Sequence, residues 1–219
     1  MVCRFGLSGS VSMGSKSSEI GRRSIGRRGA MLALPLLAAL LSGCGSKANN
    51  DTFDLAVTPM ASASDTAKGR QILVPEPTAI KSLDSDQVVV RVSPSEIQYL
   101  ANSQWGDRLP RIVQSKLVQA FENTGKLGGV GKPGQGLAID YQVVTDIRAF
   151  EVSTSGNKAA TVEISVKILN DRNGSVRAQN VFRASVPVTG SENTAFVTGI
   201  NRAFAKVGAD IVDWTLKSI

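Results

Sequence analysis

The sequence predicts a single α/β domain built as an α+β sandwich, in which two main helices pack on a mixed, mainly antiparallel sheet. Two patterns lead to this expectation. Three successive segments between residues 137 and 186 alternate apolar and polar side chains, as half-buried strands do. Two other segments, within 107–124 and 191–217, repeat apolar residues every three or four positions, as amphipathic helices do. Because each element has one apolar face, the helices are expected to cover the apolar face of the sheet.

The three alternating segments predict an antiparallel meander with turns near STSGNK and NDRNGS. Their polar positions include Asp140, Asp146 and Glu163, which we place on the solvent face. The expected core face consists of Leu137, Ile139, Tyr141, Val143, Ile147 and Ala149, then Ala160, Val162, Ile164, Val166 and Ile168, and finally Val176, Phe182, Ala184 and Val186.

Further strands are expected earlier in the chain. QVVVRV, residues 87–92, is a β-branched run suited to a buried strand. ILVPEP is a short extended segment that prolines bring to an end. Short strands are also expected at Thr52–Val57 and Leu127–Val130, so the sheet combines the meander with strands from the first half of the domain.

The first helix is expected to begin after Asp107, which we assign as its cap, with Pro110 in the first turn and Gly125 at its end. The second is expected from about Ser191. Its interior glycines, Gly199 and Gly208, each weaken a helix by about 1 kcal/mol relative to alanine. Tertiary packing must offset that loss, or the glycines allow a close approach.

The net charge of +7 does not predict nucleic-acid binding, because it is concentrated at the N-terminus. Six basic residues and one acidic residue precede Cys44, whereas 19 basic and 17 acidic residues follow from that point onward. The remaining chain is therefore nearly balanced, as an ordinary solvated surface is.

The N-terminal region is typical of an export signal. Arg22-Arg23 and Arg27-Arg28 precede the apolar run AMLALPLLAALL, residues 30–41, which is shorter than the roughly 20 residues that span a membrane. The predicted signal ends in Leu41-Ser42-Gly43-Cys44, which resembles a bacterial lipobox. The resemblance implies lipid attachment at Cys44, and Gly45 after it favours sorting to the outer membrane.

These signals divide the chain into three parts. We expect a leader and lipoprotein signal peptide at 1–43, a lipidated N-terminus and flexible tether at 44–70, and one folded domain at 71–219. The tether is rich in Ser, Ala, Asn, Thr and Asp. The mature protein would then be held at the periplasmic face of the envelope by its acyl chains.

The residue types argue against catalysis, cofactors and metals. The sequence has no histidine, and its two cysteines are Cys3, in the leader, and Cys44, which lipidation would block. GGVGKPGQG departs from the phosphate-loop pattern, because Pro133 follows Lys132 where Ser or Thr is required. The carboxylates are scattered, so a hydrolase would need a pair of them brought together in a cleft. We expect no catalytic residues, no metal site and no cofactor.

The stretch QYLANSQWGDRLP, residues 98–110, allows two interpretations. In one, Trp105 belongs to the core and Arg108 lies at the solvated start of a helix. In the other, Tyr99, Trp105 and Arg108 form a surface that binds a partner, since Trp, Tyr and Arg dominate interface hot spots. The sequence favours the core interpretation.

The same stretch carries a family resemblance. The chain resembles the ABC-type transport auxiliary lipoproteins, which include the lipoprotein subunits of MCE-type lipid transport systems. The resemblance spans roughly residues 52–217 and rests on ILVPEPTAIKSLDSDQVVVR, SPSEIQYLANSQWGDRLPRIVQSKLVQAFENTG, IDYQVVTDIRAFEV, ATVEISVKI, VFRASVPV and DIVDWT. It implies a non-enzymatic periplasmic lipoprotein with a small α/β domain, partnered by an MCE-domain protein, a permease and an ATPase.

Our main expectation is therefore an anchored accessory subunit of an ABC transporter for phospholipid or other hydrophobic molecules. The alternative is a free-standing structural or scaffold lipoprotein of the envelope, without a transporter. The neighbouring genes would separate the two. The sequence leaves the oligomeric state open, including a homo-oligomer, and does not identify the cargo.

Overall fold

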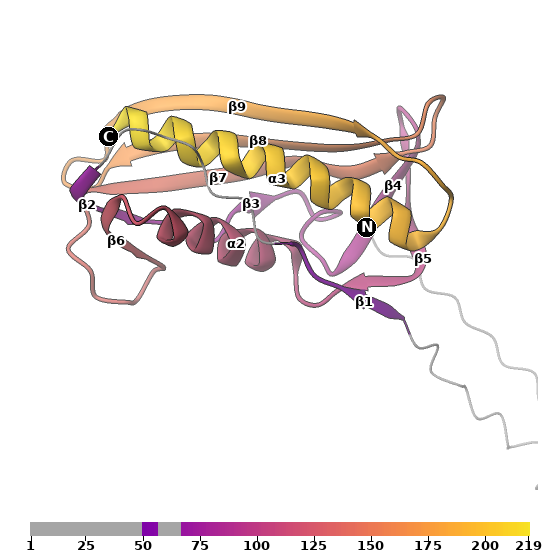
Figure 1. Ribbon diagram of the computed structural model, residues 1–219, viewed down its shortest axis with the longest axis horizontal. Coiled ribbons are helices and arrows are strands. Elements are labelled where there is room, and N and C mark those ends of the chain that lie inside the picture. Colours follow the sequence, from indigo (N-terminus) through magenta and orange to yellow (C-terminus); the bar gives the residue numbers. More distant parts are fainter. Residues whose placement is uncertain (1–49, 57–66) are drawn as a thin grey trace, which may run out of the picture. The chain divides into compact units, whose positions relative to one another are not determined.

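The computed structural model describes residues 50–56 and 67–219, so the predicted leader and Cys44 lie outside the described part. Within it the chain forms one mixed nine-stranded sheet with two helices packed on it (Figure 1), which confirms the predicted α+β fold. The elements in chain order are β1 (Asp51–Phe53), β2 (Ala67–Leu73), β3 (Thr78–Ala79), β4 (Gln87–Ser93), β5 (Glu96–Trp105), α2 (Leu109–Thr124), β6 (Leu127–Gly131), β7 (Tyr141–Ser153), β8 (Ala159–Asn170), β9 (Val176–Pro187) and α3 (Asn193–Ser218).

Strand β7 organises the sheet. On one side it pairs along its whole length with β8, and β8 pairs with β9, so the predicted antiparallel meander is confirmed. On the other side three short strands pair with it in parallel: β2 at its start, β3 in its middle and β4 at its end. β6 extends the sheet beyond β2, whereas β5 and then β1 extend it beyond β4.

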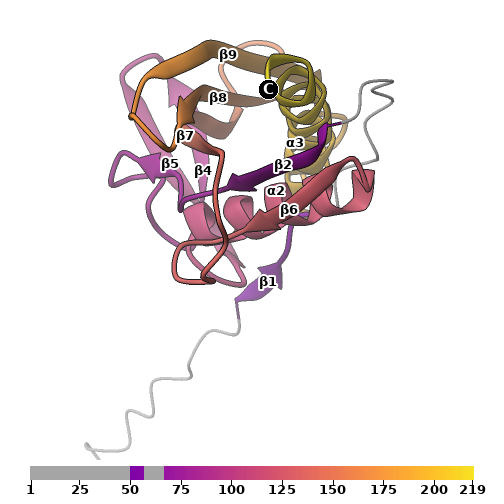
Figure 2. The ribbon, with the colours of Figure 1, turned by 90° about the vertical axis from the view of Figure 1, so that its left-hand side faces the viewer.

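The core lies between the helices and the sheet. The long helix α3 packs on β7, β8 and β9, and α2 lies beside it (Figure 2). Every second residue of β8 from Ala160 to Ile168 is fully buried, as the alternation predicts. Three aromatic rings connect the layers: Trp105 stands edge-on to Phe150 at a centroid distance of 6.0 Å, and Phe150 lies 5.8 Å from Phe204.

The end of α2 follows the prediction, but its start does not. Gly125 adopts the left-handed conformation, with φ of 60°, and its N–H donates to the carbonyl oxygen of Glu122. At the other end the cap position is Arg108, which makes no side-chain cap hydrogen bond. The prediction that Asp107 caps the helix is wrong, because its carboxylate accepts instead from the backbone N–H of Arg108 at 2.7 Å.

Gly199 allows α3 to approach the sheet closely. A Cβ atom at this position would lie 2.6 Å from Val188 Cγ2 and 3.1 Å from Ala160 Cβ. Such separations are shorter than van der Waals contact, so only glycine fits without a local shift. Of the two explanations offered for glycine in this helix, the structure supports close approach at Gly199.

Irregular pairing changes which residues face the core. A shift in the β7–β8 register between Ile147 and Ala149 turns Phe150, rather than Ala149, into the core. The β8–β9 register shifts near the start of β9, and Val176 there is 54% exposed. Leu137 precedes β7 and is also exposed. The predicted core positions Leu137, Ala149 and Val176 are therefore wrong.

Part of the segment predicted as tether takes part in the sheet. β1 pairs in parallel with β5, which agrees with the short strand expected near Thr52. Leu55 is only 2% exposed, and β2 begins at Ala67, before the domain start that we placed near Gln71. The short strand expected at Leu127–Val130 is present as β6.

Candidate functional site

The stretch 98–110 separates into a buried and an exposed part. Trp105 is 1% exposed and packs against Phe150, as the core interpretation expects. Its ring therefore offers no surface to a partner in the described structure. Tyr99 lies on β5, opposite Val89 of β4, and is 44% exposed, so it remains available for contact.

Arg108 belongs to an ion-pair network on the surface beside the start of α2. Its guanidinium contacts Asp84 and lies 3.0 Å from Glu76, which also lies 3.7 Å from Arg111. The hydrogen bond to Asp84 is the main cause that raises the pKa of Arg108 above its usual value. This network ties the segment between β2 and β4 to α2, so the side chain of Arg108 is largely occupied within the domain.

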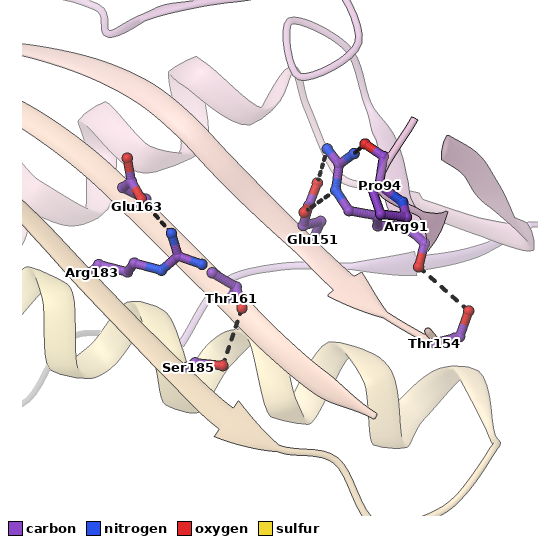
Figure 3. Close-up of polar contacts among 8 residues, drawn as sticks. All are labelled: Arg91, Pro94, Glu151, Thr154, Thr161, Glu163, Arg183 and Ser185. Carbon is purple, nitrogen blue, oxygen red and sulfur yellow. Dashed lines mark hydrogen bonds and ion pairs between the residues drawn. The ribbon is translucent and has the colours of Figure 1, made fainter. Parts of the chain in front are cut away.

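A more buried ion pair joins two strands that are far apart in the sequence. Arg91 of β4 and Glu151 of β7 form a two-pronged contact, with Nε–Oε1 at 2.5 Å and Nη2–Oε2 at 2.8 Å (Figure 3). Nη1 of Arg91 also donates to the carbonyl oxygen of Pro94 at 3.2 Å. The hydrogen bond to Glu151 raises the pKa of Arg91.

The same face of the sheet carries further polar pairs across β8 and β9. Arg183 Nη1 lies 3.0 Å from Glu163 Oε2, and the hydroxyls of Thr161 and Ser185 lie 3.2 Å apart (Figure 3). The alternation of the sequence predicts these residues on the solvent face, and all four lie on the polar face of the sheet, but Thr161 is buried there. The alternation of the sequence could not reveal the Arg91–Glu151 pair, because the parallel pairing of β4 with β7 leaves no signal in the local sequence.

Beside these pairs, the outer face is hollowed by a pocket of about 450 Å³. It is lined by Arg148, Ser165, Lys167, Gln179, Asn180 and Val181. Hydrogen-bond donors dominate this lining, and no carboxylate belongs to it. An adjoining pocket includes Asp146, which accepts a hydrogen bond from the hydroxyl of Thr78 at 2.8 Å. The arrangement suits polar contact rather than acid–base chemistry by paired carboxylates.

Two carboxylates do share a smaller pocket, of about 220 Å³, between the N-terminal segment and α2. Each has its own cation: Asp54 lies 2.7 Å from Lys116 Nζ, and Asp107 lies 3.8 Å from Arg111. Both carboxylates therefore act as ion-pair partners within the fold. Among residues 50–56 and 67–219, no group of three or more His, Cys, Asp or Glu side chains is placed to hold a metal ion.

The glycine-rich stretch 128–136 forms the end of β6 and the loop after it. The loop leads into β7 rather than into a helix, so it does not have the strand–loop–helix context of a phosphate loop. No helix in the described part of the chain is both long enough and apolar enough to cross a membrane. Cys44, the predicted lipid-attachment residue, lies outside the described residues.

A comparison with known families decides the classification. The family model for the ABC-type transport auxiliary lipoprotein component matches residues 53–212. The chain belongs to this family. The family is described as the auxiliary lipoprotein component of ABC-type transport, and lipoproteins are anchored in the cell envelope by their lipid.

The chain is also similar to a curated protein and to solved structures. It is 28% identical over 189 residues to the uncharacterized protein bll6063 of Bradyrhizobium diazoefficiens, covering 84% of this chain but only half of that protein's length. The crystal structure of XCC0632 from Xanthomonas campestris, of family DUF330, has a TM-score of 0.72 at 26% identity, covering 77% of this chain and 95% of that one. An uncharacterized protein with a TM-score of 0.61 and 16% identity, covering 76% and 99%, shares the fold.

Proposed function

We propose that the chain is the lipid-anchored accessory subunit of an MCE-type ABC transporter, which moves phospholipid or other hydrophobic molecules across the envelope. The observation that carries the proposal is the family match over residues 53–212. The Leu-Ser-Gly-Cys sequence at 41–44 supports it independently, because a lipobox is what a lipoprotein subunit requires.

The anchor is a diacylglycerol on Cys44 together with an acyl group on its amine. Each buried CH₂ contributes about 0.8 kcal/mol, so one chain binds a bilayer reversibly whereas two or three hold firmly. Gly45 follows the cysteine and favours the outer membrane as the destination. The folded domain would then work on the periplasmic side of that membrane.

The role of the domain is to dock the transport assembly at the envelope. Anchoring confines the docking site to the neighbourhood of the membrane, so the effective concentration of the site is high and modest contacts suffice. Among the three docking residues predicted from the sequence, Tyr99 fits this role best because it is 44% exposed. Trp105 supports the hairpin of β4 and β5 from within the core.

Crosslinking in the native envelope, followed by mass spectrometry, tests the proposal. We expect the MCE-domain protein, the permease or the ATPase of one system among the crosslinked partners. Recovery of other envelope complexes without any transporter subunit would instead favour the free-standing scaffold. Adjacent genes for the three partners would support the transporter assignment further.

The anchor is tested separately by Cys44→Ser, with Cys3→Ser as the matched control. We expect Cys44→Ser to abolish acyl modification, measured by mass spectrometry, and to release the protein from membranes in a flotation assay. Cys3→Ser should change neither, because the predicted leader that contains Cys3 is removed. Normal acylation of the Cys44→Ser variant would contradict the assigned lipid site.

A further inference from the structure

Residues 50–56, here called the strap, are attached to the domain by contacts spread over three elements. Asp51, Thr52 and Phe53 pair in parallel with β5. Next to β5, the N–H of Gly106 donates to the carbonyl oxygen of Phe53 at 2.8 Å. The strap therefore extends the sheet at the edge of β5.

Both helices hold the second half of the strap. The ammonium of Lys116, on α2, lies 2.7 Å from the carboxylate of Asp54, and the Lys116 side chain is only 15% exposed. The side-chain oxygen of Asn201, on α3, accepts a hydrogen bond from the N–H of Ala56 at 2.8 Å. Between these contacts Leu55 is 2% exposed and belongs to the hydrophobic core. Three independent kinds of contact thus fix a segment of seven residues.

The position of the strap limits the distance between the anchor and the domain. Only six residues, 45–50, separate Cys44 from Asp51. An extended chain spans at most about 3.3–3.6 Å per residue, so Asp51 lies within roughly 25 Å of an acylated Cys44. Without the strap contacts, the next described residue that pairs in the sheet is Ala67. The limit then rises to roughly 80 Å, by the same measure.

We propose that the strap is a clamp that holds the domain close to the lipid bilayer in which Cys44 is anchored, and that its release lengthens the tether about threefold. The inference rests on the proposed lipidation of Cys44. A tether that is flexible along its whole length has one maximum length. A strap that can dock and detach gives the tether two maximum lengths. The partner is the bilayer surface itself.

The strap is suited to detach without unfolding the domain. β1 contributes three residues and pairs only with β5, at the edge of the sheet, whereas the central strands β7 and β8 pair on both sides. Edge segments with few buried side chains open at lower free energy than central strands do. Leu55 is the buried apolar side chain of the strap, so it is the residue to change.

Energy transfer from the domain to the bilayer measures the clamp. The mature lipidated chain has no free thiol if Cys44 is acylated, so Ser155→Cys, in an exposed turn, supplies a single site for a donor dye. The labelled protein is placed in phosphatidylethanolamine–phosphatidylglycerol vesicles whose headgroups carry the acceptor. Leu55→Asp releases the strap by making its burial unfavourable.

The matched controls separate release from other effects. Val176→Asp makes the same kind of substitution at a residue that is 54% exposed and far from the strap in sequence. A Gly/Ser insertion of about ten residues after Ser46 lengthens the tether while the strap stays docked. The double variant Lys116→Ala/Asn201→Ala removes the side-chain partners of the strap without touching the strap or the core residue Leu55.

We expect Leu55→Asp and the insertion to lower the transfer efficiency, the double variant to lower it in part, and Val176→Asp to leave it unchanged. Hydrogen exchange should show faster exchange at residues 51–55 in Leu55→Asp while β8 stays protected, which establishes that the domain remains folded. If β8 also loses protection in Leu55→Asp, the Lys116→Ala/Asn201→Ala variant provides the test. Unchanged energy transfer in that variant overturns the clamp.

Failure of the clamp and failure of the lipid anchor give different results. Unchanged transfer in Leu55→Asp, with faster exchange in the strap, overturns the clamp and leaves the anchored-subunit proposal intact. Unchanged transfer on insertion overturns it as well, because the domain would then be held at the bilayer by other contacts. A mature protein that does not float with vesicles and lacks acyl groups overturns the proposed anchor, and the clamp with it.

Discussion

Arg91 and Glu151 lie 60 residues apart in the chain and face each other across β4 and β7, joined by two parallel hydrogen bonds of 2.5 and 2.8 Å. The side chain of Glu151 is 11% exposed and that of Arg91 is 35% exposed. The pair fixes the β4–β5 hairpin on the end of β7, and this hairpin carries the exposed Tyr99. An electrostatic contact within the domain thereby positions the proposed docking surface.

We expect Arg91→Met to lower the free energy of unfolding by about 1–3 kcal/mol, because it leaves a largely buried carboxylate without its partner. Urea denaturation measures the loss. Arg183→Met is the matched control: Arg183 is 64% exposed where it pairs with Glu163, and surface pairs contribute about 1 kcal/mol or less. Equal losses in the two variants would contradict the assigned role of the Arg91 pair.

The stability that the Arg91 charge provides should be insensitive to alkaline pH. Its folded-state pKa is raised above that of the unfolded chain. A raised pKa gives stability that is fully present below the unfolded pKa and lost only as the pH rises through the folded value. We therefore expect the difference between wild type and Arg91→Met to be the same at about pH 7 and about pH 9, both below the arginine range. A difference that shrinks over this interval would show another group titrating at the site.

Gly199→Ala should destabilise the domain even though alanine favours helices. The gain in helix propensity is about 1 kcal/mol, whereas forcing a methyl group against Val188 and Ala160 costs about 1–3 kcal/mol. Thermal unfolding of Gly199→Ala, of Val188→Ala and of the double variant forms a double-mutant cycle. The alanine at 199 should be better tolerated once Val188 is truncated, and strict additivity would count against the close approach.

Trp105→Ala and Tyr99→Ala should separate core from surface. Removing the buried indole is expected to cost about 3–5 kcal/mol, whereas Tyr99→Ala should change stability by about 0.5 kcal/mol or less. Calorimetry compares the stability of the two variants. Crosslinking of transporter subunits in the native envelope compares their binding to the partner. Lost crosslinking in a fully stable Tyr99→Ala protein would support docking through the hairpin. Undiminished crosslinking would remove Tyr99 from the docking surface.

Arg108→Ala should have a small effect that depends on salt. The ion pairs of Arg108 are exposed to solvent, which screens them, so the expected loss of stability is small. Because mobile ions screen exposed charges, the loss should diminish further in about 1 M sodium chloride. Unfolding at low and high salt tests this, and a large loss that salt does not reduce would indicate a buried contribution.

Much of the fold could be predicted because its signals are local. The alternation of β8 and the three- and four-residue spacing in α3 directly reflect which face is buried. β5 was not predicted, because its exposed and buried residues do not alternate regularly and Asn102 within it has a φ of 54°. The predicted alternation of β7 fails at Ala149 for a similar reason. One irregular residue in a strand moves every later side chain to the opposite face of the sheet.

The candidate sites were harder to predict, because they depend on distant pairing. Nothing near Arg91 indicates that Glu151 will be its neighbour, and nothing in the polar composition of residues 50–56 indicates that Leu55 is buried. Both follow from parallel pairings between segments that are far apart in the chain. The choice between core and surface for Trp105 likewise depended on Phe150, which comes 45 positions later.

β2, β3 and β4 all pair with the same edge of β7. This arrangement also constrains how the chain folds as it emerges with its N-terminus first. All three strands precede β7, and none of them reaches its place in the sheet until residues 141–153 have appeared. The hairpins of β7, β8 and β9 close short loops, whereas the parallel pairings close long ones at a greater entropic cost. β4 can pair earlier with β5, and β2 with β6, but the parallel pairing of β2, β3 and β4 with β7 must wait for a strand that is made later. The sheet of this topology can therefore be completed only after most of the chain has emerged.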